Sequence, residues 1–491
     1  MKPIPEQFDV IILGAGPAGL CAAIRLLEMG HTVGLLEHQA FPRPQIGESL
    51  SPGIYNIFAF LNAANLLNDP SYLTNIPSKV IWETDQYIYN NSTQKNTSII
   101  VDRSKLDQQL LLFAIKKGLH LMQPAKLKSS IYVQELWDLT IIINSANKKI
   151  FAKVVLDARG RKGALAFERL PIAPSSVASW THIHPQFMPN ETIIEAIDSG
   201  WLWGSPVTGN RYRIMAFTDG SSLKNCSYDH LALLINKTTL FASIAGKINS
   251  NEVESCSVTS YINQNPWDKQ FIKIGEAAFT LDPLSSTGVE KAMRFSLQIA
   301  IAVNTYLRDN DSKLPKEFYE SKLIESVVNH ASWTKEYYSN AWTAKSGSVF
   351  WKNKINFKLD VSKHTSAFTL QLQNEFNRSR VMSAKKQLTP IPIDIVVNKL
   401  WNEQITVSPL IAYKDDYAIN NDYIELKQAI HHPDLDMPII YLDQIELKLL
   451  LQQINGKTIA VAIEHLCQTV PYEKAKKILY FLWERHLIQM N

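Results

Sequence analysis

The stretch FDVIILGAGPAGLCAAIRLLEMG, residues 8–30, decides the fold of this chain. Its apolar run at 10–13 predicts a buried parallel strand, and an apolar pattern with helical spacing continues from Leu20 to Leu27. Between them, three glycines stand at the spacing GxGxxG, and a second apolar strand at 32–36 leads to Glu37. Strand, glycine turn, helix and strand in this order predict a βαβ unit of a parallel sheet.

Each glycine of this turn has its own function. Gly14 permits the tight turn, Gly16 lets the backbone approach a pyrophosphate, and Gly19 lets helix and strand pack closely. The helix N-terminus then offers N–H groups and a positive dipole end to the phosphates. Glu37 follows Gly19 by 18 residues, where an acid can accept hydrogen bonds from ribose hydroxyls. The pattern favours an adenine dinucleotide site over a glycine-rich turn in an ordinary βαβ unit.

Length and composition exclude several classes of protein. A chain of 491 residues allows about two to four domains, and 46% hydrophobic with 20% charged residues is typical of globular proteins. A net charge of +4 without any run of five basic residues does not support a nucleic-acid partner. Because the cysteines lack CxxC spacing, we expect reduced thiols rather than a disulfide framework or a metal site: Cys21, Cys226, Cys256 and Cys467.

The sequence predicts a cytoplasmic protein without a membrane partner. No apolar stretch reaches the length that crosses a bilayer. The first seven residues lack the apolar core of a signal peptide and lead directly into the first strand.

A loop and a helix follow the βαβ unit. The loop at 41–53 contains three prolines and carries Arg43, for which we weigh contact with the pyrophosphate against a solvated surface arginine. The helix covers 101–114 with an apolar face, and Arg103 stands at its start.

Two later strands deliver further polar groups. The buried strand from 153 ends on Asp157, and the strand from 271 leads to Glu276, an acid that can bind a ribitol or ribose hydroxyl. Asp282 and Pro283 then form a turn, and Gly288 opens a helix whose N-terminus can face a flavin carbonyl.

These segments together resemble a known group of flavoproteins. The motifs that carry the resemblance are Ile46-Gly-Glu-Ser49, Val101-Asp-Arg103, Leu156-Asp-Ala-Arg-Gly160, Gly200-Trp-Leu-Trp-Gly-Ser-Pro206 and Leu281-Asp-Pro-Leu-Ser-Ser-Thr-Gly288. They are similar to FAD enzymes of the aromatic hydroxylase type and, within that group, to the branch of flavin-dependent halogenases and related monooxygenases. The resemblance covers about residues 5–350.

The resemblance and the sequence pattern together predict an α/β protein of four parts. We expect a discontinuous, Rossmann-like FAD-binding domain and an antiparallel sheet that binds substrate. A helical region and a small winged-helix-like domain follow. The expected bounds are 1–190 with 263–345 for the FAD-binding domain, 191–262 with strands from about 76–102 for the sheet, 346–432 for the helical region and 433–491 for the last domain.

The resemblance implies FAD as the cofactor of an oxidoreductase. Its motifs put Gly47 and Ser49 along the flavin edge, and Pro283, Thr287 and Gly288 where oxygen is activated. The full set of expected cofactor-binding residues is Gly14, Gly16, Pro17, Ala18, Gly19, Glu37, Arg43, Gly47, Ser49, Arg103, Asp157, Gly275, Glu276, Pro283, Thr287, Gly288 and Val289.

Departures from the motifs of tryptophan halogenases argue against a halogenase activity. Those enzymes use a lysine that relays the oxidant and a glutamate near the last helix, and here Ser285 stands at the glutamate position. Ser205 likewise replaces an isoleucine of the tryptophan motif, although Thr287 and Gly288 match the halide-contacting pair. Lys79 is the lysine near the expected place, with a solvated lysine at a strand edge as the alternative.

The motif at 200–206, followed by Met215-Ala-Phe-Thr-Asp219, looks closer to another branch. It comprises flavoprotein maturases that oxygenate a tryptophan of a partner oxidase to build cysteine tryptophylquinone, as for lysine oxidase and glycine oxidase. We therefore expect an FAD-dependent monooxygenase that hydroxylates a tryptophan of a protein or peptide, such as a quinone-cofactor oxidase precursor. A separate flavin reductase is a candidate partner. The expected catalytic residues are Trp201, Trp203, Thr287, Glu48 and Lys79, with His330 a further candidate.

The tail from about residue 433 predicts a separate unit. A first helix ends at the C-cap signal Asn455-Gly456, a second starts at Thr458 and a third at Pro471. The order resembles a small winged-helix or peptide-chaperone domain that holds a protein substrate. The alternative is a helical cap on the main core.

Three other functions remain open on the sequence. A halogenase would incorporate chloride or bromide into an indole or phenol. A flavin reductase of polyprenyl chains would need an apolar tunnel and would turn over without oxygen. An FAD-stabilised binding protein without catalysis would leave its partner's mass unchanged.

Overall fold

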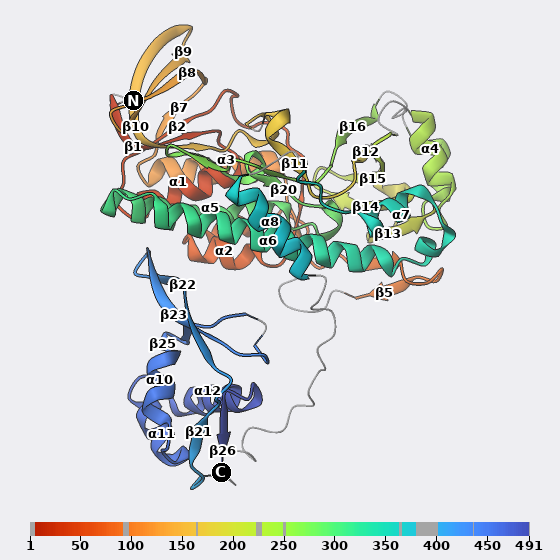
Figure 1. Ribbon diagram of the computed structural model, residues 1–491. Coiled ribbons are helices and arrows are strands. Elements are labelled where there is room, and N and C mark those ends of the chain that lie inside the picture. The colour runs from red at the N-terminus through yellow and green to blue at the C-terminus, as the bar shows by residue number, and fades with distance from the viewer. Residues whose placement is uncertain are drawn as a thin grey trace. The chain divides into compact units, whose positions relative to one another are not determined.

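The computed structural model describes residues 5–91, 98–163, 165–221, 228–248, 252–362, 366–379, 401–435 and 437–490. It divides the chain into two compact units, Met1–Ser383 and Ala384–Asn491. Figure 1 shows the helices and strands of each unit. Within the described residues, no helix is both long and apolar enough to cross a membrane. Cys21, Cys256 and Cys467 are free thiols, and Cys226 lies outside the described residues.

A mostly parallel sheet organises the first unit. In the order β19-β10-β1-β2-β7 its neighbouring strands run parallel, and β18 pairs antiparallel with β19 at the edge. The predicted first and second strands are β1 and β2, whose apolar residues are almost all buried. The bounds are β1 Gln7–Leu13, β2 Val33–Leu36, β7 His120–Met122, β10 Ala146–Asp157, β18 Trp267–Asp268 and β19 Phe271–Lys273.

Helices and a hairpin complete this half of the unit. The predicted helix after the glycine turn is α1, and it packs against α3 and α5. A hydrophobic core of strand residues such as Phe8, Ile11 and Leu139 lies between β1, β10 and the hairpin β8–β9. The bounds are α1 Pro17–Glu28, α2 Ile54–Phe60, α3 Arg103–Lys116, α5 Gly288–Asp309, β8 Ala125–Val133 and β9 Leu136–Ile143.

A second sheet forms the other half of the unit (Figure 1). Its order is β16-β12-β15-β14-β13-β4-β5, antiparallel except for the parallel pair β13 and β4. The sheet also includes β12, which precedes the expected bound at 191. The strands are β4 Ser78–Ile81, β5 Ile88–Asn90, β12 Ser176–Ile183, β13 Thr192–Ile197, β14 Gly200–Val207, β15 Arg211–Asp219 and β16 Glu254–Ser257.

Alternate residues give the second sheet two different faces. Leu202 and Ile214 belong to an aliphatic core with α4, whereas Trp201 and Phe217 belong to an aromatic core with α6 and α7. Leu284, beside the predicted cofactor turn, packs against the aromatic core. The helices are α4 Tyr228–Asn236, α6 Lys313–Ser339, α7 Val349–Asn356 and α8 Ala367–Ser379.

Two small sheets connect these halves. One contains β11, β17 and β20, and the other pairs β3 with β6 beside the loop at 46–49. Their bounds are β3 Ser49–Leu50, β6 Ile99–Ile100, β11 Arg169–Pro171, β17 Tyr261–Asn263 and β20 Phe279–Thr280.

The second unit has its own hydrophobic core, to which Leu450, Ile463 and Leu479 contribute from three helices. The predicted starts of two of them are observed, because Thr458 caps α11 and Pro471 precedes α12. The elements are β21 Ile405–Val407, β22 Ala412–Asn420, β23 Tyr423–His431, β24 Tyr441–Leu442, β25 Ile445–Glu446, α10 Leu447–Ile454, α11 Ile459–Cys467, α12 Tyr472–Glu484 and β26 Ile488–Met490.

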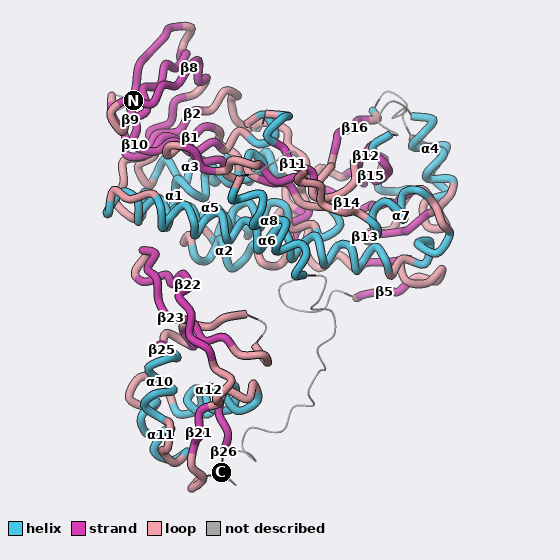
Figure 2. The backbone as a smooth tube through the Cα atoms, in the orientation of Figure 1, coloured by secondary structure: helices cyan, strands magenta, loops and turns pink. Residues whose placement is uncertain are grey.

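The predicted α/β fold class is confirmed, and one expected region needs correction. Residues 346–432 were expected to be helical, and α7 and α8 do form there. From residue 405 onward, however, the chain forms β21 and the hairpin β22–β23, as Figure 2 shows by colour. The second unit begins at Ala384 rather than at 433. The physical reason is that β21 pairs with the terminal β26, so that the chain before the three helices belongs to their core.

Candidate functional site

The glycine turn is shaped as the sequence predicts. Gly14 has a φ of +105°, and a Cβ there would lie 2.7 Å from the Ala158 carbonyl oxygen. A Cβ on Gly19 would clash with the Gly14 carbonyl oxygen, so helix and strand approach each other through these glycines. Gly16 has no atom within 4 Å of its Cβ position. Its open backbone precedes α1, whose first turn starts at Pro17 without a side-chain cap.

Glu37 follows β2 and supports this turn. Its carboxylate accepts hydrogen bonds from the Ala15 and Gln39 backbone N–H groups, at 2.9 and 2.8 Å, and only 3% of the residue is exposed. Arg43 Nη2 lies 4.0 Å from the Glu37 carboxylate, while its buried Nε lacks a hydrogen-bond partner among the described residues. Arg43 therefore stands beside the turn with a donor available.

The ends of β10 and β19 meet the same turn. Asp157 is fully buried at the end of β10 and accepts from Arg159 Nε and Nη2, at 2.8 and 2.6 Å. Gly275 has a φ of +58°, and a Cβ there would lie 2.8 Å from the Cβ of Ala18 in α1. The Glu276 side chain is 51% exposed and 3.5 Å from Arg161. The expected nucleotide residues thus gather at the carboxyl ends of parallel strands, where this fold class binds ligands.

Arg103 fastens the loop at 46–49. The buried guanidinium makes two 3.0 Å bonds to Asp107, and its Nη1 donates to the Ile46 and Gly47 carbonyls at 3.1 and 3.3 Å. Gly47 has a φ of +92°, and its Cβ position lies 4.0 Å from Val289 at the start of α5. Ser49 continues into β3. Arg103 therefore holds the loop beside α5 through backbone carbonyls.

Glu48 links this loop to the second sheet. Its carboxylate accepts from Arg213 Nη1 at 2.6 Å, and Arg213 Nε and Nη2 lie 3.0 and 2.9 Å from His182 Nε2. Burial, followed by the Arg213 charge, lowers the pKa of His182 to about 4. His182 and Arg213 were missed in the sequence because they are paired only by the antiparallel register of β12 and β15.

The turn before α5 is organised by its own side chains. Asp282 accepts from the Leu284 backbone N–H at 3.2 Å, and the Ser285 and Thr287 hydroxyls lie 2.6 Å apart. The helix begins at Gly288 without a side-chain cap. Its Glu290 accepts from Ser51 and from Arg294. Pro283 to Val289 therefore lies next to the 46–51 loop, as expected for two segments around one cofactor.

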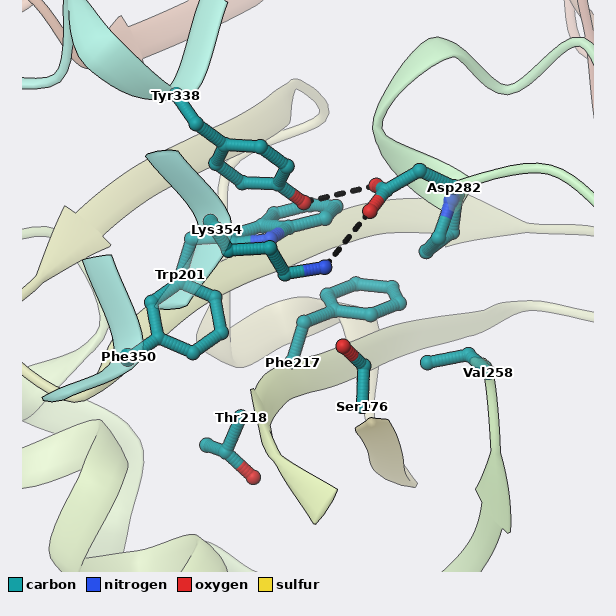
Figure 3. A pocket seen from close by; sticks show the side chains of 10 residues that line it. Ser176, Trp201, Phe217, Thr218, Val258, Asp282, Tyr338, Phe350 and Lys354 are labelled. Atoms are coloured by element: carbon teal, nitrogen blue, oxygen red, sulfur yellow. Dashed lines mark hydrogen bonds and ion pairs between the residues drawn. The ribbon is translucent and has the colours of Figure 1, made fainter. Parts of the chain in front are cut away.

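The aromatic face of the second sheet and the turn before α5 line one narrow, closely packed pocket (Figure 3). Its volume is about 170 Å³ with the open mouth included, and its side chains leave no room for a water molecule between them. Trp201 is stacked on Phe217, with ring centroids 3.9 Å apart and an interplanar angle of 14°. Trp203 lies on the same face and is half-buried. The lining residues are Ser176, Trp201, Phe217, Thr218, Val258, Asp282, Pro283, Tyr338, Phe350 and Lys354.

Three polar side chains converge in this pocket. Asp282 accepts from Tyr338 Oη and Lys354 Nζ, each at 2.8 Å. Burial by itself raises the pKa of Asp282, but Lys354 and Tyr338 hold that pKa below its ordinary value. Burial and the Asp282 charge raise the pKa of Tyr338 well above its ordinary value. Tyr338 stands on a helix face for which the sequence favours a core stripe over an active-site wall, and for Lys354, 72 residues from Asp282, the sequence offered no signal.

Two other catalytic candidates lie outside this pocket. Lys79 on β4 pairs with Glu191 at 2.9 Å and lines neither described pocket. His330 lines a second pocket of about 650 Å³, its open mouth included, which also contacts Asp282, Tyr338 and Lys354. Burial lowers the pKa of His330.

The chain's residues fit an adenine dinucleotide that carries a flavin. Two uncapped helix N-termini, those of α1 and α5, present backbone N–H groups, and the Gly16 backbone is open to close approach. The unpartnered Arg43 Nε adds a donor near the phosphate position.

Comparison with known proteins agrees with this geometry. The family described as tryptophan halogenase matches residues 9–72. Tryptophan 2-halogenase of Chondromyces crocatus is 24% identical over 343 residues, 65% of this chain and 65% of that protein, so the match spans less than two thirds of its length. The putative FAD-dependent oxidoreductase LodB of Marinomonas mediterranea is 22% identical over 305 residues, 59% of this chain and 82% of LodB.

Two solved structures share the fold over nearly the whole chain. The flavin-dependent halogenase CmlS aligns with a TM-score of 0.71 at 19% identity, covering 99% of this chain and 96% of CmlS. The peptidyl tryptophan dihydroxylase QhpG, essential for tryptophylquinone cofactor biogenesis, aligns with a TM-score of 0.70 at 17% identity, covering 98% of this chain and 100% of QhpG. The predicted resemblance to halogenase-like flavoproteins is confirmed, as is FAD as the cofactor of the group.

Proposed function

We propose that this chain is an FAD-dependent monooxygenase that hydroxylates an aromatic side chain, tryptophan in the first instance, of a protein or peptide. The observation that carries the proposal is the shared pocket, in which Pro283 of the cofactor turn faces the Trp201–Phe217 stack. A planar ring that binds against this stack, once the side chains that now fill the pocket move apart, would lie beside the cofactor turn. Similarity to QhpG, a peptidyl tryptophan dihydroxylase, supports a polypeptide substrate, although the halogenase CmlS aligns over as much of this chain.

The chain's residues divide the work of such a reaction. Gly14, Gly16 and Gly19 would bind the pyrophosphate, and the loop held by Arg103 would lie along the flavin edge. When bound and reduced, FAD supplies two electrons and activates O₂. Trp201 and the side chains around it would exclude water from the reacting ring.

The position of Lys79 favours hydroxylation over halogenation. A relay lysine must reach the substrate pocket, but the Lys79 ammonium is paired with Glu191 and lies over the Tyr87 ring at 5.7 Å. Ser285, at the position of the halogenase glutamate, is hydrogen-bonded to Thr287 instead. The halogenases among the relatives keep halogenation of an indole as the second candidate.

The test uses the FAD-loaded full chain with NADH, a separate flavin reductase, ¹⁸O₂ and bromide. Total protein from source cells lacking this chain serves as substrate, and peptides are read by mass spectrometry. We expect ¹⁸O on a tryptophan of one protein. Bromine in place of ¹⁸O would establish a halogenase. If FAD is bound but no protein is labelled, the result would favour a binding protein without catalysis.

A matched pair of glycine variants controls the test. Gly16→Asp puts a negative charge where the backbone must approach phosphate, whereas Gly246→Asp changes an equally open, exposed glycine far from the turn in sequence. Gly16→Asp should lose FAD binding and the ¹⁸O label together, and Gly246→Asp should keep both.

A further inference from the structure

The ion pair between Asp282 and Lys354 is deeply buried. Both side chains are 5% exposed, and their charged atoms are 2.8 Å apart. Asp282 precedes the cofactor turn, and Lys354 projects from α7. Replacing a buried ion pair with apolar residues is often neutral or stabilising, so stability alone does not account for this one.

The contacts leave Lys354 with donors to spare. An ammonium has three N–H groups, and Asp282 is the acceptor that the structure gives it. The ammonium lies 4.8 Å from the Tyr338 ring centroid and 5.8 Å from that of Phe350, so it is enclosed by aromatic rings. Figure 3 shows it pointing between Asp282 and Phe217, into the pocket.

The ion pair also stands between two pockets. Asp282, Tyr338 and Lys354 line both the pocket of the Trp201–Phe217 stack and the larger second pocket. In the second pocket, Ser260 Oγ and His330 Nε2 are buried without a hydrogen-bond partner among the described residues. Buried polar atoms of this kind are groups that bind water or ligand. Lys354 thus lines both pockets, and the second, mostly apolar pocket brings the Ser260 hydroxyl and the His330 ring to the same ion pair.

We propose that Lys354 is a catalytic proton donor of the hydroxylation. Asp282 and Tyr338 hold its ammonium in place, and the amine is reprotonated through the second pocket. This inference rests on the proposed function. The overall reaction joins one oxygen atom of O₂ to a ring carbon, with loss of the ring proton, and releases the other atom as water. NADH supplies the two electrons as one hydride, and one further proton is consumed. Lys354 delivers one of the protons that the departing oxygen requires and takes it back from solvent.

Lys354 is a different lysine from Lys79, which the sequence suggested, and it lies on a different element. Lys79 lies on β4 in a partly exposed ion pair, whereas Lys354 lies on α7 and lines the same pocket as Pro283. A neutral side chain of similar length at 354 leaves the departing oxygen without its donor, so oxygen is released as hydrogen peroxide instead of water.

The experiment compares Lys354→Met with Lys352→Met, an exposed lysine on the same helix. The probe is the polypeptide that gains ¹⁸O from the wild-type holoenzyme. For Lys354→Met we expect product formation to fall on the order of 100-fold, with hydrogen peroxide matching the NADH consumed. Lys352→Met should behave as wild type. If Lys354→Met forms as much product per NADH consumed as the wild-type enzyme, the proposal is overturned.

A double variant separates chemistry from folding. Lys354→Met leaves the Asp282 charge unpaired, whereas Asp282→Asn with Lys354→Met removes both charges. We expect the double variant to keep the wild-type melting temperature and the wild-type dissociation constant for FAD, and still to release peroxide. A loss of FAD binding that parallels the loss of product would assign the pair a structural role and overturn the proposal. Wild-type holoenzyme that labels no polypeptide would instead overturn the proposed function, and this inference with it.

Discussion

The two faces of the second sheet are built by the same strands from different chemistry. On β14, Leu202 points to an aliphatic core under α4, and its neighbour Trp201 points to the aromatic core under α6 and α7. The buried pair Asp282–Lys354 packs at the aromatic core, and the Glu48–Arg213–His182 network extends from the strand residues of that same side. On the aliphatic face, the buried Glu195 lies beside Ile193 and Ile197, but its carboxylate accepts from the backbone N–H groups of Thr239 and Leu240 and from no cation that the structure describes.

The difference indicates which face serves stability and which serves function. An aliphatic core gains free energy from each buried methylene, at little electrostatic cost. Charges buried among aromatic rings cost free energy unless every partner is in place. These buried charges lie on the face that packs against the cofactor turn. The following substitutions test the contrast between the aliphatic and the aromatic face.

The largest expected effect comes from Asp282→Asn on the aromatic face. It leaves the Lys354 ammonium buried without a counter-charge, and removing one partner of a buried pair costs about 3–5 kcal/mol. The free energy of unfolding, measured by urea titration with Lys352→Met as control, should fall by that amount. A loss below about 1 kcal/mol would show that the pair is effectively solvated.

Leu202→Ala tests the aliphatic face. Leu202 is fully buried, so truncation leaves a cavity and should lower the free energy of unfolding by about 3 kcal/mol. Because the side chain points away from the pocket, the dissociation constant for FAD should not change at temperatures where the variant is folded. A weakened FAD complex would contradict the division of roles between the faces.

The pH dependence of stability tests the polar end of the aromatic face. His182 has its pKa lowered to about 4 in the folded chain, against an ordinary value of 6.5, so the unfolded chain binds the extra proton first. Stability should therefore be complete above pH 6.5 and decline towards pH 4, by about 1–2 kcal/mol after allowance for the partly exposed ring. The variant His182→Gln keeps an acceptor for Arg213. In urea titrations, its free energy of unfolding should lack this decline between pH 6.5 and pH 4.

The smallest effect is expected for Lys79→Met. The ion pair with Glu191 is partly exposed, at 27% and 16%, and such pairs contribute about 0–1 kcal/mol. Product formation should stay within about twofold of wild type, measured alongside Lys354→Met. A loss of product as large as that of Lys354→Met would show that Lys79 takes part in the reaction.

Short-range patterns were enough to predict much of the fold. The glycine turn, α1, the start of α5 and the helices α11 and α12 follow from signals within a few residues, because turns, caps and helix periodicity are local. The region from 405 to 431 was mispredicted as helical, because its strands depend on pairing with each other and with β26.

The sequence by itself determined the βαβ unit and the flavoprotein resemblance, since each rests on short motifs that are local in the chain. Only the tertiary structure placed Lys354 beside Asp282, Arg213 beside Glu48, and Lys79 away from the pocket. These pairs span 72 and 165 residues, and no local pattern encodes a contact that forms only when α7 and the second sheet pack against the cofactor turn. Motif spacing therefore indicated the half that carries the glycine turn, and long-range packing decided which charged groups line the pocket at Trp201 and Phe217.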